Sequence, residues 1–500
     1  MLFAGCGFQP KSEQSEQAGS FFSSPLCHEC SACSEEEPVP DHTFIVEDPA
    51  SLETLAQIPD MGPDDARHAV ERAHLALVPW ARRAPRERAD ILMRTYELML
   101  EQSETLAELI TRENGKSLTD AAAEVRYAAE FFRWYAEEAV RPEGSYGTAP
   151  GGTSRTIVTH RPVGVTALVT PWNFPAAMVT RKVAPALAAG CSAVLKPAAE
   201  TPLTALAIAD LLSDAGAPDD LLTVVTTSDP GPVVDAWLGD ERVRKLSFTG
   251  STRVGRLLLR SAADRVVNCS MELGGNAPVI VAADADLDRA VAGTMVAKFR
   301  NGGQACTAAN RILVHEDIVE RFTEKLSEQV CRLEVGAAHS GAAIGPMINE
   351  RERDRLNKLI ASAVADGARV TCQAQLPDLP GHFVAPTVLV DVDPGAALLQ
   401  EELFGPVAPI VVWRNEEEVV ELANATEQGL AAYVFAGDLA YSIRLAEQLE
   451  AGMVGINRGV VSDPSAPFGG VKQSGLGREG ARDGIRAFQE TQYLSVDWPQ

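Results

Sequence analysis

Short apolar runs alternate with helical patterns over most of this 500-residue chain. Between the runs, apolar residues recur at three- and four-residue spacing, as in residues 204–215, 287–299 and 318–333. Buried strands that alternate with helices indicate doubly wound parallel sheets, which usually bind ligands at the carboxyl ends of their strands. We therefore predict an α/β fold with strands at residues 163–169, 192–195, 221–225, 245–248, 278–281 and 311–314.

The chain before these strands is predicted to be mainly helical. Residues 49–63 have the character of a strand-and-turn lead-in, and helical spacing follows at residues 64–78, 85–111 and 118–140. A further helix is expected around residues 184–189. The third of the early helices carries an aromatic face that we assign to the core and to no chemistry: Phe131, Phe132, Trp134 and Tyr135.

The charge balance excludes several classes of partner. The chain has 44 Lys and Arg against 69 Asp and Glu, a formal net charge of -25. Such a surface is unsuited to nucleic acid or to an anionic membrane, so an anionic substrate needs a local basic pocket. No apolar run is long enough for a membrane-spanning helix, and the amino terminus is a poor secretion signal. We expect a cytoplasmic protein.

The nine cysteines show no framework spacing, which is typical of reduced thiols in the cytosol. Cys27, Cys30 and Cys33 could together hold zinc or an iron–sulfur cluster, but no second half of such a site is evident, so no metal is predicted. The flanking residues are rich in Ser, Gln, Glu and Pro, so residues 1–40 are predicted to be a disordered extension. A metal-binding regulatory function of this segment stays open.

One cysteine stands in a setting that suits a nucleophile. Cys306 follows Gly302 and Gly303 in the stretch 299–307, and these glycines let the backbone bend tightly around the sulfur. A thiol reacts as its thiolate, so a working cysteine needs backbone amides, a cation or a nearby base. Most cysteines are small, buried apolar residues without a chemical role. The motifs that accompany Cys306 are what make it a candidate nucleophile.

Three further stretches, in this order and at this spacing, accompany Cys306: residues 170–175 (TPWNFP), 271–276 (MELGGN) and 401–406 (EELFGP). Together with residues 467–480 (PFGGVKQSGLGREG), they resemble the NAD(P)-dependent aldehyde dehydrogenase superfamily, within it most closely the succinate-semialdehyde dehydrogenases. The resemblance covers roughly residues 44–496.

The resemblance implies four catalytic residues. Cys306 adds to the aldehyde and forms a thiohemiacetal, whose oxyanion is stabilised by the Asn173 side chain and the Cys306 amide. After hydride loss to the nicotinamide, Glu272 activates the water that hydrolyses the thioester, or takes the proton of the thiol earlier. Lys182 supports proton handling and cofactor contacts in this region.

The cofactor implied is NADP or NAD. Residues 250–255 offer a helix start for a phosphate, with Ser251 as the cap, although an ordinary capped turn has the same sequence. Many relatives carry a ribose-binding glutamate where this chain has Ala199, and the neighbouring carboxylate stands at Glu200 instead, so NADP is favoured. The implied cofactor residues are Trp172, Asn173, Lys196, Pro197, Ala198, Ala199, Gly250, Ser251, Leu273, Glu402 and Phe404.

Three residues indicate the substrate. Arg181, Arg300 and Ser462 match the residues that bind the substrate carboxylate in succinate-semialdehyde dehydrogenases. The resemblance therefore implies oxidation of succinate semialdehyde, a small anionic aldehyde, to succinate. Another omega-carboxylated aldehyde, such as glutarate semialdehyde, stays open as the substrate. A catalytically silent structural paralogue is the alternative from a different class.

The resemblance also implies the domain organisation. The NAD(P)-binding domain is expected at residues 41–141 and 162–273, with a doubly wound parallel sheet, and the α/β catalytic domain at 274–475. Residues 142–161 and 486–500 are expected to form a small β segment for assembly into a homodimer or homotetramer.

Overall fold

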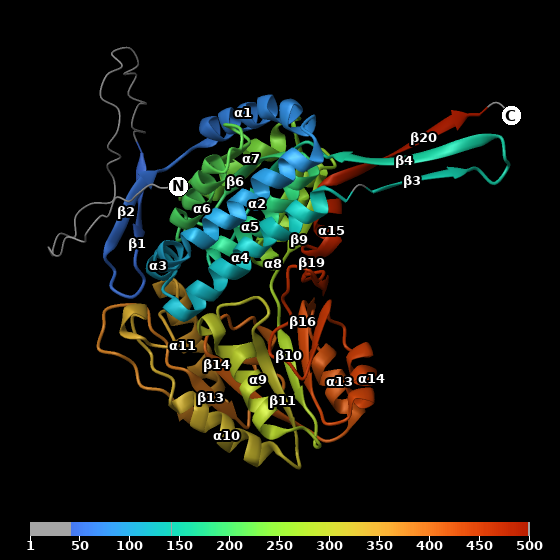
Figure 1. Ribbon diagram of the computed structural model, residues 1–500. Helices are drawn as coiled ribbons and strands as arrows, with labels where there is room; N and C mark the ends of the chain where they lie inside the picture. Colours follow the sequence, from blue (N-terminus) through green and yellow to red (C-terminus); the bar gives the residue numbers. More distant parts are fainter. Residues whose placement is uncertain (1–41, 142, 499–500) are drawn as a thin grey trace, which may run out of the picture. The chain divides into compact units, whose positions relative to one another are not determined.

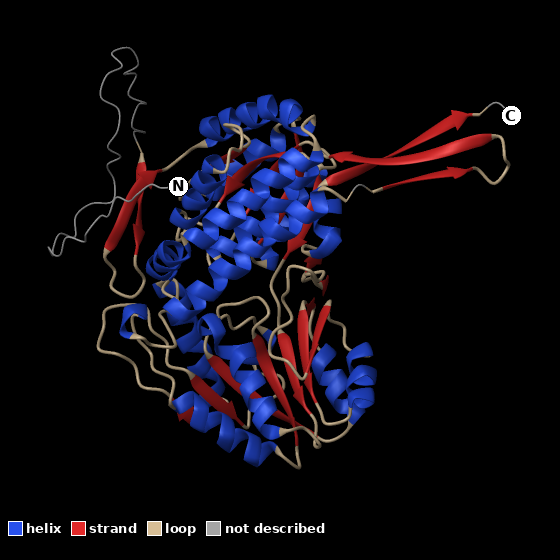
Figure 2. Cartoon of the chain, viewed as in Figure 1, coloured by secondary structure: helices blue, strands red, loops and turns tan. Residues whose placement is uncertain are grey.

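Two parallel β-sheets, each covered by helices on both faces, carry most of the chain (Figure 1). The structure is a computed structural model, and it describes residues 42–141 and 143–498. The predicted extension at residues 1–40, with Cys27, Cys30 and Cys33, lies outside the described residues. The α/β class predicted from the alternating pattern is confirmed, with helices and strands interleaved in both halves (Figure 2).

The first sheet has the strand order β19-β9-β8-β5-β6-β7. Its strands are parallel apart from β19, which pairs antiparallel with β9. The order places β5 between β8 and β6, so the loops after these strands open at the same edge. The bounds are β5 (Val165–Val169), β6 (Ser192–Lys196), β7 (Leu222–Val224), β8 (Val243–Thr249), β9 (Asn268–Glu272) and β19 (Gly475–Leu476).

Alternation along β5 explains why both faces of this sheet are covered. Val165, Ala167 and Val169 pack into one apolar cluster, and Leu168 packs into another on the opposite face. The first cluster is completed by α1 (Pro63–Ala81), α7 (Pro230–Gly239) and α8 (Thr252–Ala263). The second contains α2 (Pro85–Glu101), α3 (Ser103–Asn114), α4 (Leu118–Ala139), α5 (Pro175–Ala189) and α6 (Leu203–Asp214).

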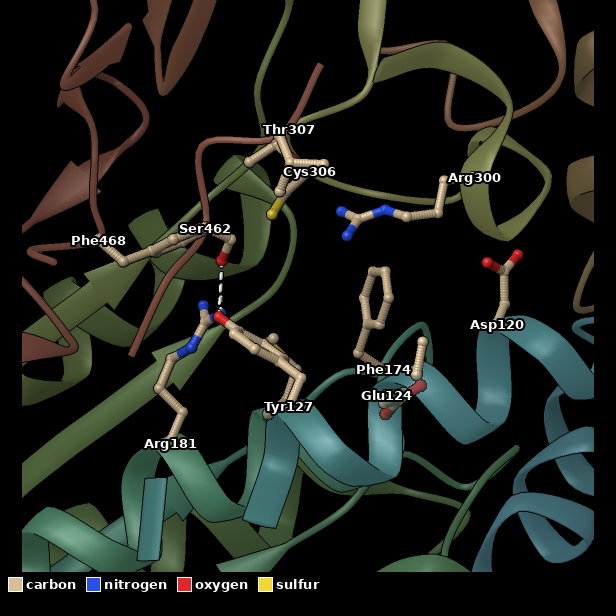
Figure 3. A pocket seen from close by; sticks show the side chains of 13 residues that line it. Asp120, Glu124, Tyr127, Phe174, Arg181, Arg300, Cys306, Thr307, Ser462 and Phe468 are labelled. Atoms are coloured by element: carbon tan, nitrogen blue, oxygen red, sulfur yellow. Dashed lines mark hydrogen bonds between the residues drawn. The ribbon is translucent and has the colours of Figure 1, made fainter. Parts of the chain in front are cut away.

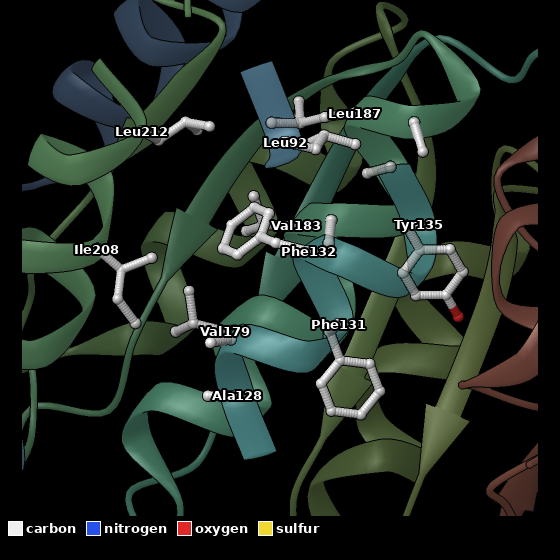
Figure 4. Packing of buried hydrophobic residues seen from close by; sticks show 14 of the residues in the cluster. Leu92, Ala128, Phe131, Phe132, Tyr135, Val179, Val183, Leu187, Ile208 and Leu212 are labelled. Atoms are coloured by element: carbon white, nitrogen blue, oxygen red, sulfur yellow. The ribbon is translucent and has the colours of Figure 1, made fainter. Parts of the chain in front are cut away.

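Helices α4 and α5 pack closely, and this contact positions much of the site. Phe132 of α4 lies among Val179 and Val183 of α5 and is fully buried (Figure 4). Burial of one such side chain stabilises the fold by about 1.5–3 kcal/mol. The aromatic face predicted for residues 118–140 is therefore core at Phe131, Phe132 and Tyr135, while Trp134 is only partly buried.

The prediction of one helix over residues 85–111 is wrong. The helix ends at Glu101, and α3 begins at Ser103, because Gln102 leaves the helical region with φ -103° and ψ 21°. Leu106 and Ile110 of α3 pack into the same cluster as Leu92 of α2. The apolar spacing thus continues across the break, which is why periodicity did not reveal it.

The second sheet has the order β12-β13-β14-β11-β10-β16-β17, with β12 antiparallel to β13 and the other neighbours parallel. Helices α9 (Leu287–Phe299) and α10 (Val319–Cys331) pack on one face, and α11 (Glu350–Ala365), α13 (Glu416–Asn424) and α14 (Leu439–Glu447) on the other. The strands are β10 (Ala277–Val281), β11 (Ala309–His315), β12 (Arg369–Gln373), β13 (Thr387–Val390), β14 (Val407–Trp413), β16 (Ala431–Phe435) and β17 (Met453–Ile456).

A disulfide joins Cys331, at the end of α10, to Cys372 in the edge strand β12. The two residues are 41 positions apart, and their Cα atoms lie 5.9 Å apart. The prediction of reduced thiols is therefore wrong for this pair, because the packing of α10 beside β12 brings together cysteines whose spacing carries no signal.

A three-stranded antiparallel sheet projects from the helices (Figure 1), with β4 in the middle. Its strands are β3 (Gly144–Thr148), β4 (Ser154–Pro162) and β20 (Gln489–Asp497). Apart from Pro162, these strands lie within residues 142–161 and 486–500, where a small β segment was predicted, and β4 pairs with both β3 and β20.

Smaller elements complete the fold. The lead-in predicted at residues 49–63 contains β2 (Thr54–Pro59), which pairs with the earlier strand β1 (Thr43–Glu47). A second short pair joins β15 (Gln428–Gly429) to β18 (Val471–Lys472). Among the helices of residues 42–141 and 143–498, none combines the length and the apolar character that a membrane crossing requires. The remaining helical turns are η1 (Arg300–Gly303), η2 (Ala338–Ser340), α12 (Ala397–Gln400) and α15 (Ala481–Arg486).

Candidate active site

The turn before Cys306 is left-handed over three residues. Asn301, Gly302 and Gly303 have φ values of 53°, 59° and 74°. A Cβ at Gly303 would lie 2.3 Å from the carbonyl oxygen of Gly405, so no larger residue fits there. The predicted tight bend at the two glycines is confirmed, and it brings Cys306 to the end of a buried turn.

Cys306 lies between two cavities, and its side chain contributes to both walls. One cavity has a volume of about 230 Å³ and the other of about 410 Å³. Met178 of α5 is the other residue that borders both. We call the smaller one the arginine cavity, because Arg181 and Arg300 line it, and the larger one the glycine cavity, because Gly250 and Gly274 line it.

The arginine cavity brings together the three residues predicted to bind a carboxylate. Arg181 comes from α5, Arg300 from η1, and Ser462 from the loop after β17 (Figure 3). The guanidinium of Arg300 lies 5.6 Å from the ring centre of Phe174 and has no hydrogen-bond or ion-pair partner among the described residues. It is therefore free to bind an anion in two-point fashion.

Arg181, in contrast, is held on several sides. Its Nη2 donates to the hydroxyl of Tyr127 at 2.7 Å and, more weakly, to Ser462 Oγ at 3.4 Å. Its guanidinium lies 4.0 Å from the ring centre of Phe468, and its Nη1 is 3.8 Å from Glu479 Oε2. Arg181 is 2% exposed, so this cation is fixed inside the protein.

The glycine cavity contains most of the predicted cofactor residues, contributed by the loops after β5 and β8 and by the stretch 402–404. Ser251 accepts a hydrogen bond from Val254 N and caps α8, as predicted. Glu402 accepts from Gly275 N at 3.1 Å. The predicted residues in its wall are Trp172, Asn173, Gly250, Ser251, Glu272, Leu273, Cys306, Glu402 and Phe404.

These groups fit a nicotinamide dinucleotide. The start of α8 is the positive end of a helix dipole, which suits a pyrophosphate. A Cβ at Gly274 would lie 2.5 Å from Glu402 Oε2, so the glycine keeps that carboxylate accessible for hydroxyl groups. Lys196 ends β6, next to the end of β5, and Pro197, Ala198 and Ala199 follow it; all four are outside the described wall of this cavity.

Glu272 ends β9 and is 3% exposed. Neither of its carboxylate oxygens has a hydrogen-bond partner within residues 42–141 and 143–498. Burial, and then the negative charge of Glu479, raise the pKa of Glu272 well above its ordinary value. A carboxyl group whose pKa is raised in this way can release and accept a proton near neutral pH.

The Cys306 thiol is not a ready thiolate. Burial raises its pKa to about 12, while the positive charge of Arg181 lowers it. The thiol therefore needs a base to lose its proton, and Glu272 shares the wall of the glycine cavity with it.

Asn173 is held by contacts that the sequence did not reveal. Its Nδ2 donates to Gln304 O at 3.0 Å, which leaves one N–H of the amide for a ligand. The backbone carbonyl oxygen of Asn173 accepts hydrogen bonds from Lys116 Nζ at 2.8 Å and from Asn301 Nδ2 at 2.9 Å. Lys116 in turn forms a fully buried ion pair with Glu124. These contacts fix the loop that carries the amide.

Lys182 lies outside the described walls of both cavities. It is fully buried, 2.5 Å from Glu479 Oε1 and 3.0 Å from Ser247 Oγ. Glu479 thus links Lys182 with Arg181 and acts electrostatically on Glu272. No role was predicted for Glu479, which stands in the motif 467–480, although an acidic residue among glycines was a usable signal.

Tyr127 is a second site residue for which no role was predicted from the sequence. It lies on α4, four positions before Phe131, and the two rings meet edge to face at 5.1 Å. A tyrosine within an aromatic helix face looks like core in the sequence. Only the packing shows that its hydroxyl reaches the cavity wall.

The chain is similar to many known proteins, among them two dehydrogenases and one solved structure. The chain is 50% identical to a succinate-semialdehyde dehydrogenase of Paenarthrobacter nicotinovorans, over 89% of this chain and 99% of the relative. It is also 50% identical to a 3-sulfolactaldehyde dehydrogenase of Pseudomonas putida, over 91% and 93%. A crystal structure of an Escherichia coli NADP-dependent enzyme superposes with a TM-score of 0.90 at 46% identity, over 91% of this chain and 95% of that one.

The sequence matches the aldehyde dehydrogenase family over residues 37–494, which includes both sheets and both cavities. The match and the geometry around Cys306 agree with the resemblance noted in the sequence. The chain belongs to the aldehyde dehydrogenase family.

Proposed function

We propose that the protein oxidises short aldehydes with an anionic end, and that its substrate is succinate semialdehyde, which it converts to succinate. The observation that carries the proposal is the arginine cavity, where two guanidinium groups face the space beside Cys306 in a chain with a net charge of -25. The two relatives named above are dehydrogenases of aldehydes that end in a carboxylate and in a sulfonate.

The chain's own groups account for the covalent steps. Glu272 takes the proton of the Cys306 thiol, and the sulfur adds to the carbonyl carbon to give a thiohemiacetal. The free N–H of Asn173 and the Cys306 amide stabilise the oxyanion, each by about 3 kcal/mol in the barrier. The nicotinamide ring, when bound in the glycine cavity, supplies the hydride acceptor.

Loss of hydride leaves a thioester on Cys306. Glu272 first releases to solvent the proton that it took from the thiol, and then takes a proton from water, whose oxygen bonds to the acyl carbon while the carbon–sulfur bond breaks. The sulfur leaves as thiolate, and its reprotonation restores the resting thiol. Glu272 thus serves both half-reactions, for which a raised pKa is suited.

For the cofactor, family membership implies NAD(P), and we propose a preference for NADP. Lys196 ends β6, and burial lowers its pKa to about 8, partly opposed by Glu200. With alanine at position 199, no carboxylate at that position repels a 2'-phosphate. The Escherichia coli structure is described as NADP-dependent. Reduction of NAD and none of NADP would overturn this preference.

The substrate is tested by comparing succinate semialdehyde with butanal, which has the same four carbons and no charge. We expect kcat/KM to favour the charged aldehyde by at least about 100-fold, since hydrogen bonds to charged groups are worth roughly 1.5–3 kcal/mol each. Arg300→Ala should remove most of this advantage. Arg332→Ala is the control, because that arginine is exposed directly after the end of α10. Equal use of both aldehydes by the unmodified protein would contradict the proposal.

Glutarate semialdehyde, one methylene longer, remains the alternative. A pocket distinguishes such neighbours by only about 10- to 200-fold, so both aldehydes need to be measured with the same preparation. A higher kcat/KM for the longer aldehyde would change the named substrate and leave the anionic class unchanged.

We also propose that β3, β4 and β20 take part in a homodimer or homotetramer, with residues 41–141 and 162–273 as the cofactor domain and 274–475 as the catalytic domain. Tyr146 and Tyr493 are exposed on the projecting sheet and Trp498 is exposed directly after β20, which suits a subunit contact. Light scattering tests this, and a monomer at micromolar concentration would contradict it. The cytoplasmic location stays a prediction.

A further inference from the structure

A chain of three polar groups forms one side of the arginine cavity. The Tyr127 hydroxyl lies between Arg181 Nη2, at 2.7 Å, and Ser462 Oγ, at 2.6 Å (Figure 3). Tyr127 and Ser462 are 335 positions apart, and Tyr127 is on α4 while Ser462 follows β17. The hydroxyl therefore connects the helical layer to a loop of the second sheet.

The number of hydroxyl protons determines which hydrogen bonds these three groups can offer to a ligand. Arg181 can only donate, so the Tyr127 oxygen accepts its hydrogen bond. Tyr127 and Ser462 carry one proton each, and a single proton serves the bond between them. One hydroxyl proton is therefore left over, whichever of the two donates. Beside a fixed guanidinium, that donor suits an anion.

The apolar residues beside these three groups let the cavity distinguish charged from uncharged aldehydes. Met178, Val460 and Phe468 supply apolar wall next to the three groups, and the Arg181 guanidinium is stacked on the ring of Phe468. An uncharged alkyl end can pack in the same space without using the donors. The hydroxyl of Tyr127 thus affects the binding of charged and uncharged aldehydes differently.

We propose that Tyr127 is a positioning residue that holds Arg181 and Ser462 as one receptor for the anionic end of the substrate, and so sets the preference for charged aldehydes. This inference rests on the proposed function and adds to it a residue outside the motifs that indicated the carboxylate site. Arg300, which has a free guanidinium, binds the anion independently of Tyr127.

The test is Tyr127→Phe, which removes one oxygen and keeps the ring. With succinate semialdehyde we expect KM to rise about 10- to 100-fold and kcat to change less than about threefold, because the loss concerns binding of the remote end. With butanal both constants should stay within about threefold of the unmodified protein. Tyr96→Phe is the matched control, because Tyr96 is on α2 and does not border the cavity as described.

Ser462→Ala extends the test and replaces it if Tyr127→Phe does not fold. If the two hydroxyls act as one unit, the double variant should lose much less than the product of the single losses. Equal losses with both aldehydes, or multiplicative losses in the double variant, would overturn the inference.

The two proposals fail in different ways. If the unmodified protein shows no preference for succinate semialdehyde over butanal, both proposals fall. If the preference exists, disappears in Arg300→Ala and survives in Tyr127→Phe, only the role of Tyr127 falls.

Discussion

The two cavities that meet at Cys306 are built in different ways. The glycine cavity is lined mainly by loops and turns, and its predicted residues lie in the motif stretches around 170–175, 271–276 and 401–406 and at the start of α8. The arginine cavity is lined largely by one face of α4 and by α5, with η1 and the loop after β17 opposite.

The difference has a physical cause. Residues at the carboxyl ends of parallel strands converge on one edge, so a motif after a strand indicates a site directly. A residue on a helix face enters a site only if the packing turns that face toward it, and the same residue types also build cores. We therefore expect changes in the glycine cavity to affect every aldehyde alike, and changes in the arginine cavity to depend on the charge of the aldehyde.

The largest effect should come from Cys306, which borders both cavities. Cys306→Ala should lower kcat by about 10⁴-fold or more with any aldehyde, since no other group in the walls can form the thioester. Cofactor binding, followed by NADPH fluorescence, should be retained. Residual turnover within about 100-fold of the unmodified protein would show that Cys306 is not the nucleophile.

The second largest effect on kcat is expected from the loss of Glu272, the proposed general base. Glu272→Gln should lower kcat by about 10²- to 10⁴-fold for charged and uncharged aldehydes alike. Because the pKa of Glu272 is raised, the carboxyl group is protonated at low pH, and activity should rise as pH increases and the group ionises. The variant should lose this dependence, as a pH series of kcat/KM would reveal. A steep rise that persists in the variant would assign the ionisation to another group.

A smaller effect is expected within the glycine cavity alone. Glu402→Gln should raise the KM for the cofactor by about 10- to 100-fold, since one charged hydrogen-bond acceptor is lost, with the same factor for succinate semialdehyde and butanal. Glu401→Gln is the control, because that neighbour is exposed and its one ion-pair partner among the described residues is Arg355, at 3.8 Å. If the KM for the cofactor rose by different factors with the two aldehydes, the two cavities would not act independently.

The smallest effect is a change of cofactor preference with pH. Burial lowers the pKa of Lys196 to about 8, so the cation is present below that pH and lost above it. One unit above the pKa, only about a tenth of the lysine is charged, and the ratio of NADP to NAD kcat/KM should fall about tenfold. Lys196→Gln should make the ratio independent of pH. A constant ratio in the unmodified protein would place the 2'-phosphate elsewhere.

The strands and the nucleophile turn were predictable from the sequence because their signals are local. The run 192–195 became β6, one residue longer, and the helix predicted at 118–140 became α4. Gly302 and Gly303 adopt the positive φ values that a tight bend needs. Strand β9 was not predicted as such, because its sequence, Asn268–Glu272, is mixed in polarity, and it is partly exposed at its start.

The contacts of the site residues could not be predicted. Nothing in the sequence shows that Lys182 and Glu479, 297 positions apart, form a buried ion pair, or that Lys116 and Glu124 fix the backbone of Asn173. Each contact depends on how two elements pack, and packing is decided by many weak interactions that a single local pattern does not contain.

The sequence by itself determined the α/β class, the family and the residues of the motif loops, because periodicity, glycines and short motifs act over a few residues. Only the tertiary structure decided that Tyr127 belongs to the arginine cavity, that Cys331 bonds to Cys372, and that Arg181 is held while Arg300 is free. The reason is distance along the chain: these contacts join residues that meet only after α4, α5 and the two sheets have packed.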